Sequence, residues 1–194
     1  RWSPDGKAIA YRGIVTEGSG DAPNPDIFVA NVESGFNRRL TEDPSVDREP
    51  GWSRDGRWIF FSSDRGGKLD LWKVSSEGGD PIQLTSDGGI DPYASEDGKW
   101  IYYLTTPHQP DVYRIPVSGG ESELVLAGEV RSFAFWTLWN NQIVYRHRDG
   151  KELPCSQSLD PSLHEVVPEA QASRGASPAG CAGGRRGAPA PAEG

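Results

Sequence analysis

The sequence predicts an all-β fold, a β-propeller built from four-stranded antiparallel blades, and three observations predict it. Glycine (24) and proline (16) supply 40 of the 194 residues, a share that favours turns over long helices. Aromatic residues remain plentiful, with 7 Trp, 6 Tyr and 6 Phe, so the chain can form a core. Three groups of motifs recur with a period of about 40–50 residues, which is typical of propeller blades with four strands each.

The first repeated element is a turn followed by an apolar strand. It occurs at residues 2–7 (WSPDGK), 52–57 (WSRDGR) and 94–99 (ASEDGK), and four mainly apolar residues follow each copy. Asp-Gly between apolar runs predicts a hairpin, because a type I′ turn needs positive φ at both central residues. The strand after the turn does not alternate with polar residues. We therefore expect both of its faces to be covered, as stacking between blades would do.

Two further elements complete each repeat and set its limits. One is a strand that begins at Asp26, Asp70 or Asp111, and the other is a short closing strand at residues 39–41, 83–85 and 123–125. A short outermost strand protects the edge of a blade. The repeats predict blades at residues 1–41, 46–85 and 90–126, followed by a degraded unit at 131–153. The propeller is thus expected to be incomplete, with about three and a half blades in residues 1–153.

The degraded fourth unit has Asn140 and Asn141 where Asp-Gly is expected, and asparagine also tolerates positive φ. Beyond it, residues 155–194 contain no Trp, Tyr, Phe or Ile, and Ala, Gly, Pro and Ser supply 24 of the 40 positions. Such a stretch buries too little apolar area to offset its chain entropy, which predicts a disordered tail at 154–194. Two origins stay open: a natural tail, or translation out of frame near residue 155.

Charge and composition exclude several classes of function. The net charge of −8 argues against direct binding of nucleic acid or anionic membrane, which needs a basic face. The longest apolar runs have about five residues, far short of the roughly 18 that a membrane span requires. The two cysteines belong to no CxxC or Cys/His cluster, so neither a zinc site nor a disulfide framework is predicted.

No catalytic, cofactor or metal motif is present. The chain contains no GxSxG, HExxH, P-loop, GxGxxG or EF-hand loop, and no motif places a nucleophile near His108, His147 or His164. The Asp-Gly pairs lack the alternating oxygen ligands of a calcium loop, so we interpret them as turns. The sequence predicts neither catalytic residues nor a cofactor.

Charged residues in the loops that lead from one blade into the innermost strand of the next are the candidate binding residues. Propeller ligands usually meet the face where such loops gather, at the mouth of the channel. The alternative is that they are ordinary solvated loops. The candidates for contact with a partner are Asp47, Arg48, Glu49, Asp91 and Arg131. For Arg65, which follows the second apolar strand, we favour a brace between strands over ligand contact, because arginine can pair with carboxylates and backbone carbonyls.

Residues 2–7 and 52–57 resemble the TolB-type propeller repeat of bacteria. Residues 63–67 (SDRGG), 70–74 (DLWKV) and 83–85 (QLT) match that repeat as well, and the resemblance covers about residues 1–150. Arg54 in place of proline, and residues 94–96, depart from it. The resemblance implies a propeller of six or more blades, a larger bacterial parent protein and, by analogy, the periplasm. The absence of methionine also indicates that the natural N-terminus is missing.

The resemblance implies a non-catalytic module that binds a protein or peptide, and two rival functions stay open. One is the propeller gate of a prolyl-oligopeptidase-like serine peptidase whose catalytic domain lies outside this chain. The other is the sensor of a winged-helix transcriptional regulator, which would be cytoplasmic; residues 81–126 resemble such fused propellers. Because terminal blades of an incomplete propeller expose apolar flanks, we expect the isolated chain to oligomerise or to be poorly soluble.

Overall fold

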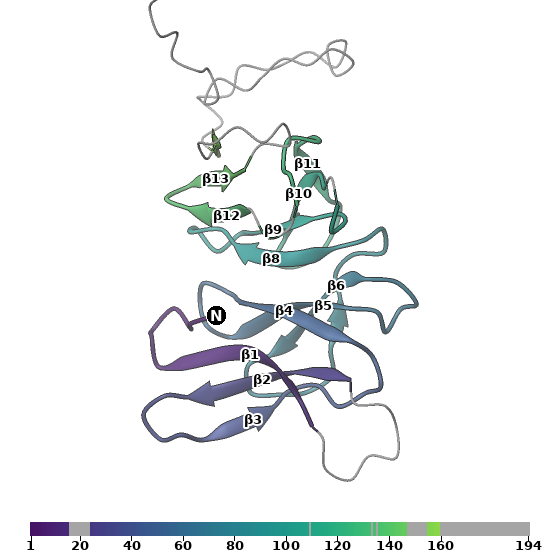
Figure 1. Cartoon of the computed structure of the whole chain (residues 1–194). Coiled ribbons are helices and arrows are strands. Elements are labelled where there is room, and N and C mark those ends of the chain that lie inside the picture. The colour runs from purple at the N-terminus through teal and green to yellow at the C-terminus, as the bar shows by residue number, and fades with distance from the viewer. Residues whose placement is uncertain (16–23, 109, 133, 135, 147–154, 160–194) are drawn as a thin grey trace, which may run out of the picture.

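The structure is a computed structural model that describes residues 1–15, 24–108, 110–132, 134, 136–146 and 155–159, and it contains four antiparallel sheets in sequence order (Figure 1). The first sheet holds β1 (Ala8–Ile14), β2 (Pro25–Asn31) and β3 (Asn37–Arg39). The second holds β4 (Asp47–Trp52), β5 (Trp58–Ser63), β6 (Asp70–Ser75) and β7 (Ile82–Gln83). The third holds β8 (Ile90–Ala94), β9 (Trp100–Leu104), β10 (Val112–Pro116) and β11 (Glu123–Leu126). The fourth holds β12 (Trp136–Trp139), β13 (Gln142–Tyr145) and β14 (Cys155–Ser158).

The predicted all-β propeller architecture is confirmed, and the second and third sheets have the expected four strands in simple meander order. The first and fourth sheets have three strands in the described residues. In the first sheet, the expected innermost strand is represented by a single bridge between Trp2 and Ile9.

The fourth blade extends beyond residue 153, the limit predicted from the sequence. Strand β14 lies in the segment that had been assigned to the tail, yet it pairs with β13 from Tyr145↔Cys155 to Gln142↔Ser158. The fourth sheet therefore continues to Ser158, past the expected boundary at residue 153, because backbone pairing can add a polar segment that composition does not mark as a strand. The rest of the predicted tail, residues 160–194, lies outside the described residues. The two origins considered for this segment, a natural tail or translation out of frame, stay open.

The repeated Asp-Gly turn has a different geometry from the predicted type I′ turn. In the first copy the N–H of Gly6 donates to the carbonyl of Ser3 at 3.0 Å, and within this turn positive φ occurs only at Gly6 (71°). Pro4 and Asp5 are therefore the central residues of a type I turn, and the glycine follows them in the left-handed region. Gly56 (73°) and Gly98 (70°) repeat this arrangement.

The type I′ turn occurs instead in the degraded fourth blade. Trp139 pairs with Gln142, so the loop between β12 and β13 has two residues. These are Asn140 (φ 48°) and Asn141 (φ 54°), and positive φ at both positions defines the turn. The prediction that asparagine tolerates this conformation is confirmed.

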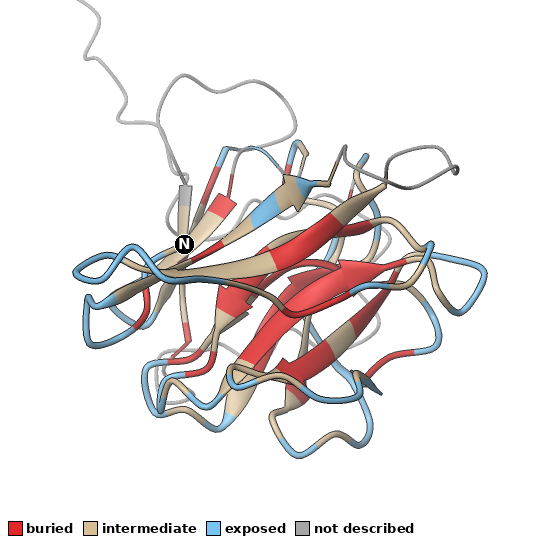
Figure 2. Ribbon diagram, turned by 90° about the horizontal axis from the view of Figure 1, so that it is seen from below, coloured by how far each residue is buried: buried red, intermediate tan, exposed pale blue. Residues whose placement is uncertain are grey.

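The core consists of three apolar clusters, each formed mainly by residues of two successive sheets. Figure 2 shows that buried residues lie mainly in the strands and exposed residues mainly in the loops. Strand β5 shows how one strand serves two of the clusters. Ile59 and Phe61 join the cluster with the first sheet, whereas Phe60 joins the cluster with the third sheet. All three side chains are fully buried, which confirms that the strand after the turn is covered on both faces.

The closing Leu-Thr motif fixes the outer strand through its threonine as well as its leucine. In the second blade Leu84 is buried, and Oγ1 of Thr85 accepts a hydrogen bond from the N–H of Leu71 at 2.9 Å. In the third blade the pairing of β10 with β11 shifts between Val112 and Tyr113, so that Val112 lies opposite Leu126. Leu126 is the buried leucine there, whereas Leu124 is 54% exposed.

Candidate functional site

Asp47 and Arg65 form a brace at the start of the second blade. Asp47 is fully buried, and Arg65 donates to it at 2.8 Å while pairing with Asp43 at 2.9 Å. The guanidinium also lies 5.3 Å from the ring centroid of Phe61 and 5.1 Å from that of Trp72. Burial raises the pKa of Asp47, and hydrogen bonds and the charge of Arg65 oppose that rise. The predicted brace is confirmed.

Glu49 and Asp91 occupy equivalent positions in successive blades, and the structure brings them together. Both precede a proline on an innermost strand and both have positive φ, 55° and 52°. One carboxylate oxygen of Glu49 accepts hydrogen bonds from the hydroxyl of Ser62 at 2.9 Å and from the N–H of Asp91 at 3.1 Å. This contact joins strands β4 and β8.

The side chain of Asp91 extends this connection to the first and fourth blades. It pairs with the guanidinium of Arg1, which lies 3.6 Å from the ring centroid of Tyr93, and it accepts a hydrogen bond from Nε1 of Trp136 at 2.8 Å. Burial raises the pKa of Asp91 to about 6 and the charge of Glu49 adds to the rise, whereas Arg1 and Trp136 lower it. Asp91 therefore joins elements of all four blades.

Arg48 and Arg131, the other two predicted residues, differ in their exposure to solvent. Arg48 is half-buried on β4. Arg131 is exposed, and its backbone N–H donates to the carbonyl of Arg146 at 3.0 Å. Of the five predicted contact residues, Asp47, Glu49 and Asp91 thus form side-chain bonds with other parts of the chain, and the side chain of Arg131 is exposed.

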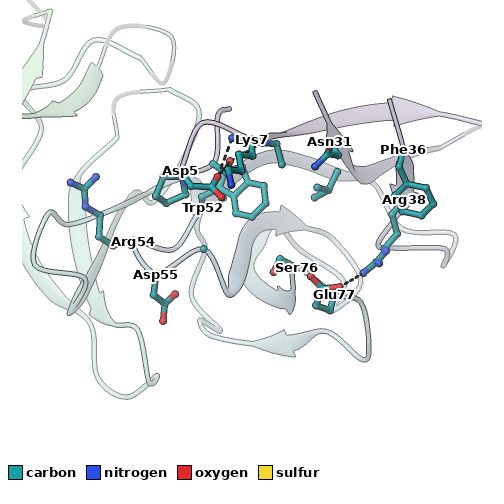
Figure 3. Close-up of a pocket in the computed structure, with 15 residues that line it drawn as sticks. Asp5, Lys7, Asn31, Phe36, Arg38, Trp52, Arg54, Asp55, Ser76 and Glu77 are labelled. Carbon is teal, nitrogen blue, oxygen red and sulfur yellow. Dashed lines mark hydrogen bonds and ion pairs between the residues drawn. The ribbon is translucent and has the colours of Figure 1, made fainter. Parts of the chain in front are cut away.

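A groove of about 650 Å³ lies at the seam between the first and second blades (Figure 3). Its walls come from the turns that join the first two and the last two strands of each blade, so it lies at the edge opposite the loops that carry Asp47 and Asp91. The lining residues are Ser3, Pro4, Asp5, Lys7, Ala8, Val29, Asn31, Phe36, Arg38, Trp52, Arg54, Asp55, Gly56, Ser76 and Glu77.

Contacts across the seam fix the shape of this groove. Arg38 of the first blade donates to Glu77 of the second at 2.8 Å, and Nε1 of Trp52 donates to the carbonyl of Arg1 at 3.0 Å. Phe36 is 60% exposed at one end of the groove, and Arg54 lies at the other end in Figure 3.

A second hollow of about 250 Å³ adjoins the groove and shares Pro4, Trp52 and Arg54 with it. It continues toward the inner strands, where Trp2 and Tyr93 line it. The five contact residues predicted from the sequence line neither hollow, because all of them come from loops at the opposite edge of the blades. The departure of Arg54 from the repeat was the available signal.

The described part of the chain holds no group of three or more His, Cys, Asp or Glu side chains arranged for a metal ion. Among the same residues, no helix has the length and hydropathy to cross a membrane.

A sequence model of the TolB beta propeller domain matches residues 1–106, more than half of the chain. The chain belongs to this family. The uncharacterized protein Atu1656 of Agrobacterium fabrum is 32% identical over 117 residues, which are 59% of this chain and 37% of that protein. The Tol-Pal system protein TolB of Bordetella pertussis is 40% identical over 55 residues, which are 28% of this chain and 13% of that protein. The chain thus spans well under half of these relatives.

Solved structures agree with the propeller fold. TolB from Acinetobacter baumannii superposes with a TM-score of 0.57 at 22% identity, covering 82% of this chain and 40% of that one. A prolyl endopeptidase superposes with a TM-score of 0.59 at 16% identity, covering 81% and 26%. At these identities the likeness concerns the fold alone.

Proposed function

We propose that this TolB-type propeller is a non-catalytic module that binds a protein or peptide. The observation that carries the proposal is the seam groove, whose volume of about 650 Å³ lies within the range of roughly 300–1,000 Å³ that is usual for ligand sites. Large aromatic residues such as Phe36 and Trp52 are enriched at protein interfaces, and Phe36 is held exposed at the rim.

Contacts between the two blades support the groove, and a site formed before binding lowers the entropic cost of binding. The ion pair of Arg38 with Glu77 holds its two walls together, and a buried cluster that includes Ala10, Ile59 and Val74 packs the blades beneath it. The relative from Bordetella pertussis is named as a Tol-Pal system protein, which agrees with a role among other proteins.

The residues predicted from the opposite loops have a different part in this proposal. Asp47, Glu49 and Asp91 hold strands and blades in place, so their contribution to binding is indirect. Arg131 is the residue of that set whose exposure suits direct contact with a partner. The peptidase-gate and regulator hypotheses are no better supported, since the peptidase neighbours share only the fold.

Selection of a random peptide library against the chain tests the proposed function. We expect enriched peptides that bind the chain, lose binding to Phe36→Asp and keep it with Trp139→Ser. Trp139 is the matched control because it is 68% exposed but lies outside the groove. Failure to enrich any peptide, or equal binding to both variants, would contradict binding in the groove.

A further inference from the structure

The acidic side chains of the seam groove are already engaged by the protein. Oδ1 of Asp5 accepts hydrogen bonds from the hydroxyl of Ser3 at 2.6 Å and from the N–H of Lys7 at 3.0 Å. Glu77 is paired with Arg38. Both carboxylates therefore already accept hydrogen bonds from the chain, so we do not propose them as contacts for a cationic ligand.

Asp55, the equivalent aspartate of the second blade, is engaged in the same way. It accepts hydrogen bonds from the hydroxyl of Ser53 at 2.6 Å, from the N–H of Arg57 at 3.1 Å and from Nε of Arg57 at 2.6 Å. These donors lower the pKa of Asp55 to about 2, Ser53 contributing most.

Arg54 differs from these carboxylates, because it has no such partner among the described residues. It is exposed, and its side chain forms no ion pair or hydrogen bond with any residue that the structure describes. It nevertheless lines both the seam groove and the adjoining hollow. Among the other charged residues of the groove, Glu77 pairs with Arg38, Asp55 pairs with Arg57, and the charge of Lys7 acts on Asp5. Arg54 is therefore the lining cation that has no acidic partner among the described residues, although the chain as a whole carries a net charge of −8.

The turn itself does not require arginine at this position. Pro4 occupies the equivalent place in the first blade and Glu96 in the third, and the turn closes at the same length in all three copies. The Gly N–H to Ser carbonyl distances are 3.0, 3.0 and 3.1 Å. The cation is thus an addition to a turn that already folds with proline or glutamate.

The positions of the labelled side chains define the form of the ligand. Arg54 lies at one end of the groove and Phe36 at the other, with Trp52 between them (Figure 3). A single compact anion cannot contact both ends, whereas an extended chain can place a charge and an apolar group several residues apart.

We propose that the seam groove holds an extended peptide segment of a partner protein, with an acidic side chain at Arg54 and a large apolar side chain against Phe36 and Trp52. This rests on the proposed binding function and adds the chemistry of the partner. Because most of the surface repels an acidic peptide, the uncompensated cation fixes where and in which direction the peptide lies.

Fluorescence anisotropy with two labelled peptides tests the proposal on the chain. The probes are fluorescein-labelled Gly-Asp-Gly-Gly-Phe-Gly and the matched peptide with lysine in place of aspartate. We expect the aspartate peptide to bind more tightly. Arg54→Pro should weaken that binding about tenfold, which is the loss of roughly one charge-assisted hydrogen bond.

Arg54→Pro is a suitable variant because Pro4 shows that proline fits this turn, and Arg54→Glu gives a second, charge-reversed variant. Arg12→Gln is the control, since Arg12 is an exposed arginine of β1 outside the groove. Circular dichroism establishes that each variant is folded.

The outcomes separate this inference from the proposed function. If both peptides bind equally and Arg54→Pro changes nothing, while Phe36→Asp still abolishes the binding of selected peptides, the acidic ligand is wrong and the binding module stands. If neither the labelled nor the selected peptides bind, both are wrong. Loss of binding in Arg12→Gln as large as in Arg54→Pro also overturns the inference, because it would reflect total charge alone.

Discussion

Nε1 of Trp136 donates a hydrogen bond to the carboxylate of Asp91 at 2.8 Å, across the boundary between the third and fourth blades. The same carboxylate pairs with Arg1 of the first blade. A residue that looked like a solvated loop charge is thus a buried junction between blades. This arrangement makes the stability of the fold depend on the protonation of one carboxyl group.

Acidification from pH 7 to pH 4 should stabilise the chain through Asp91. Its pKa is about 6 in the folded chain and 3.8 ordinarily, so the folded state binds the proton more tightly. Stability therefore rises as the pH falls through 6, and the gain is complete below about 3.8. The shift corresponds to an order of 3 kcal/mol. Asp91→Asn should remove most of this pH dependence in urea unfolding at pH 7 and pH 4.5.

Asp87→Asn provides the control for this experiment, because it also removes one carboxylate but at an exposed position away from the contacts of Asp91. Asp26 and Asp47, whose pKa values are also raised by burial, should leave a smaller slope of the same sign in Asp91→Asn. An Asp91→Asn chain with the full wild-type slope would show that another group is responsible.

Gly51→Ala should destabilise the fold because the second and third blades approach closely at this residue. A Cβ atom at Gly51 would lie 2.6 Å from the carbonyl oxygen of Pro92. Overpacking of this kind costs about 1–3 kcal/mol, measurable as a lower urea midpoint. In Gly66→Ala the new Cβ would lie no closer than 3.5 Å to a neighbour, so that variant should be near neutral. Equal midpoints for the two variants would refute the close approach.

Arg65→Met should be among the most damaging single substitutions at the start of the second blade. It leaves the fully buried Asp47 without its cation, and removing one partner of a buried pair costs about 3–5 kcal/mol. Chemical denaturation measures this loss. The double variant Asp47→Asn/Arg65→Met should recover part of it. A loss under about 1 kcal/mol for Arg65→Met would mean that the brace is dispensable.

Ser53→Ala should weaken the second blade through the turn that precedes β5. The buried hydroxyl of Ser53 donates to Asp55 at 2.6 Å and accepts from the N–H of Trp58 at 2.9 Å. Its removal leaves that N–H without its partner, at a cost of about 1–3 kcal/mol in the free energy of unfolding. Ser118→Ala, an exposed serine in another turn, should change stability by less than about 0.5 kcal/mol. Similar effects of both substitutions would argue against the turn as a source of stability.

Much of the fold could be predicted because its signals are local. The turns at residues 2–7, 52–57 and 94–99 need glycine in the left-handed region, and the apolar strands after them need cover on both faces. These requirements act within a few residues, so they repeat visibly along the chain. The polar strand β14 carries no such signal, since backbone pairing with β13 forms it, and composition assigned it to the tail.

The candidate site was harder to predict because it depends on which charges meet across blades. The sequence by itself determined the repeat, the order of the strands and the unbroken apolar run of β5, which is covered on both faces. Only the tertiary structure decided that Asp47 and Asp91 are buried among partners, whereas Arg54 has no ion-pair partner among the described residues and lines a groove between two blades. Burial and ion pairing depend on distances between residues that are far apart in the chain, and no local pattern encodes those distances.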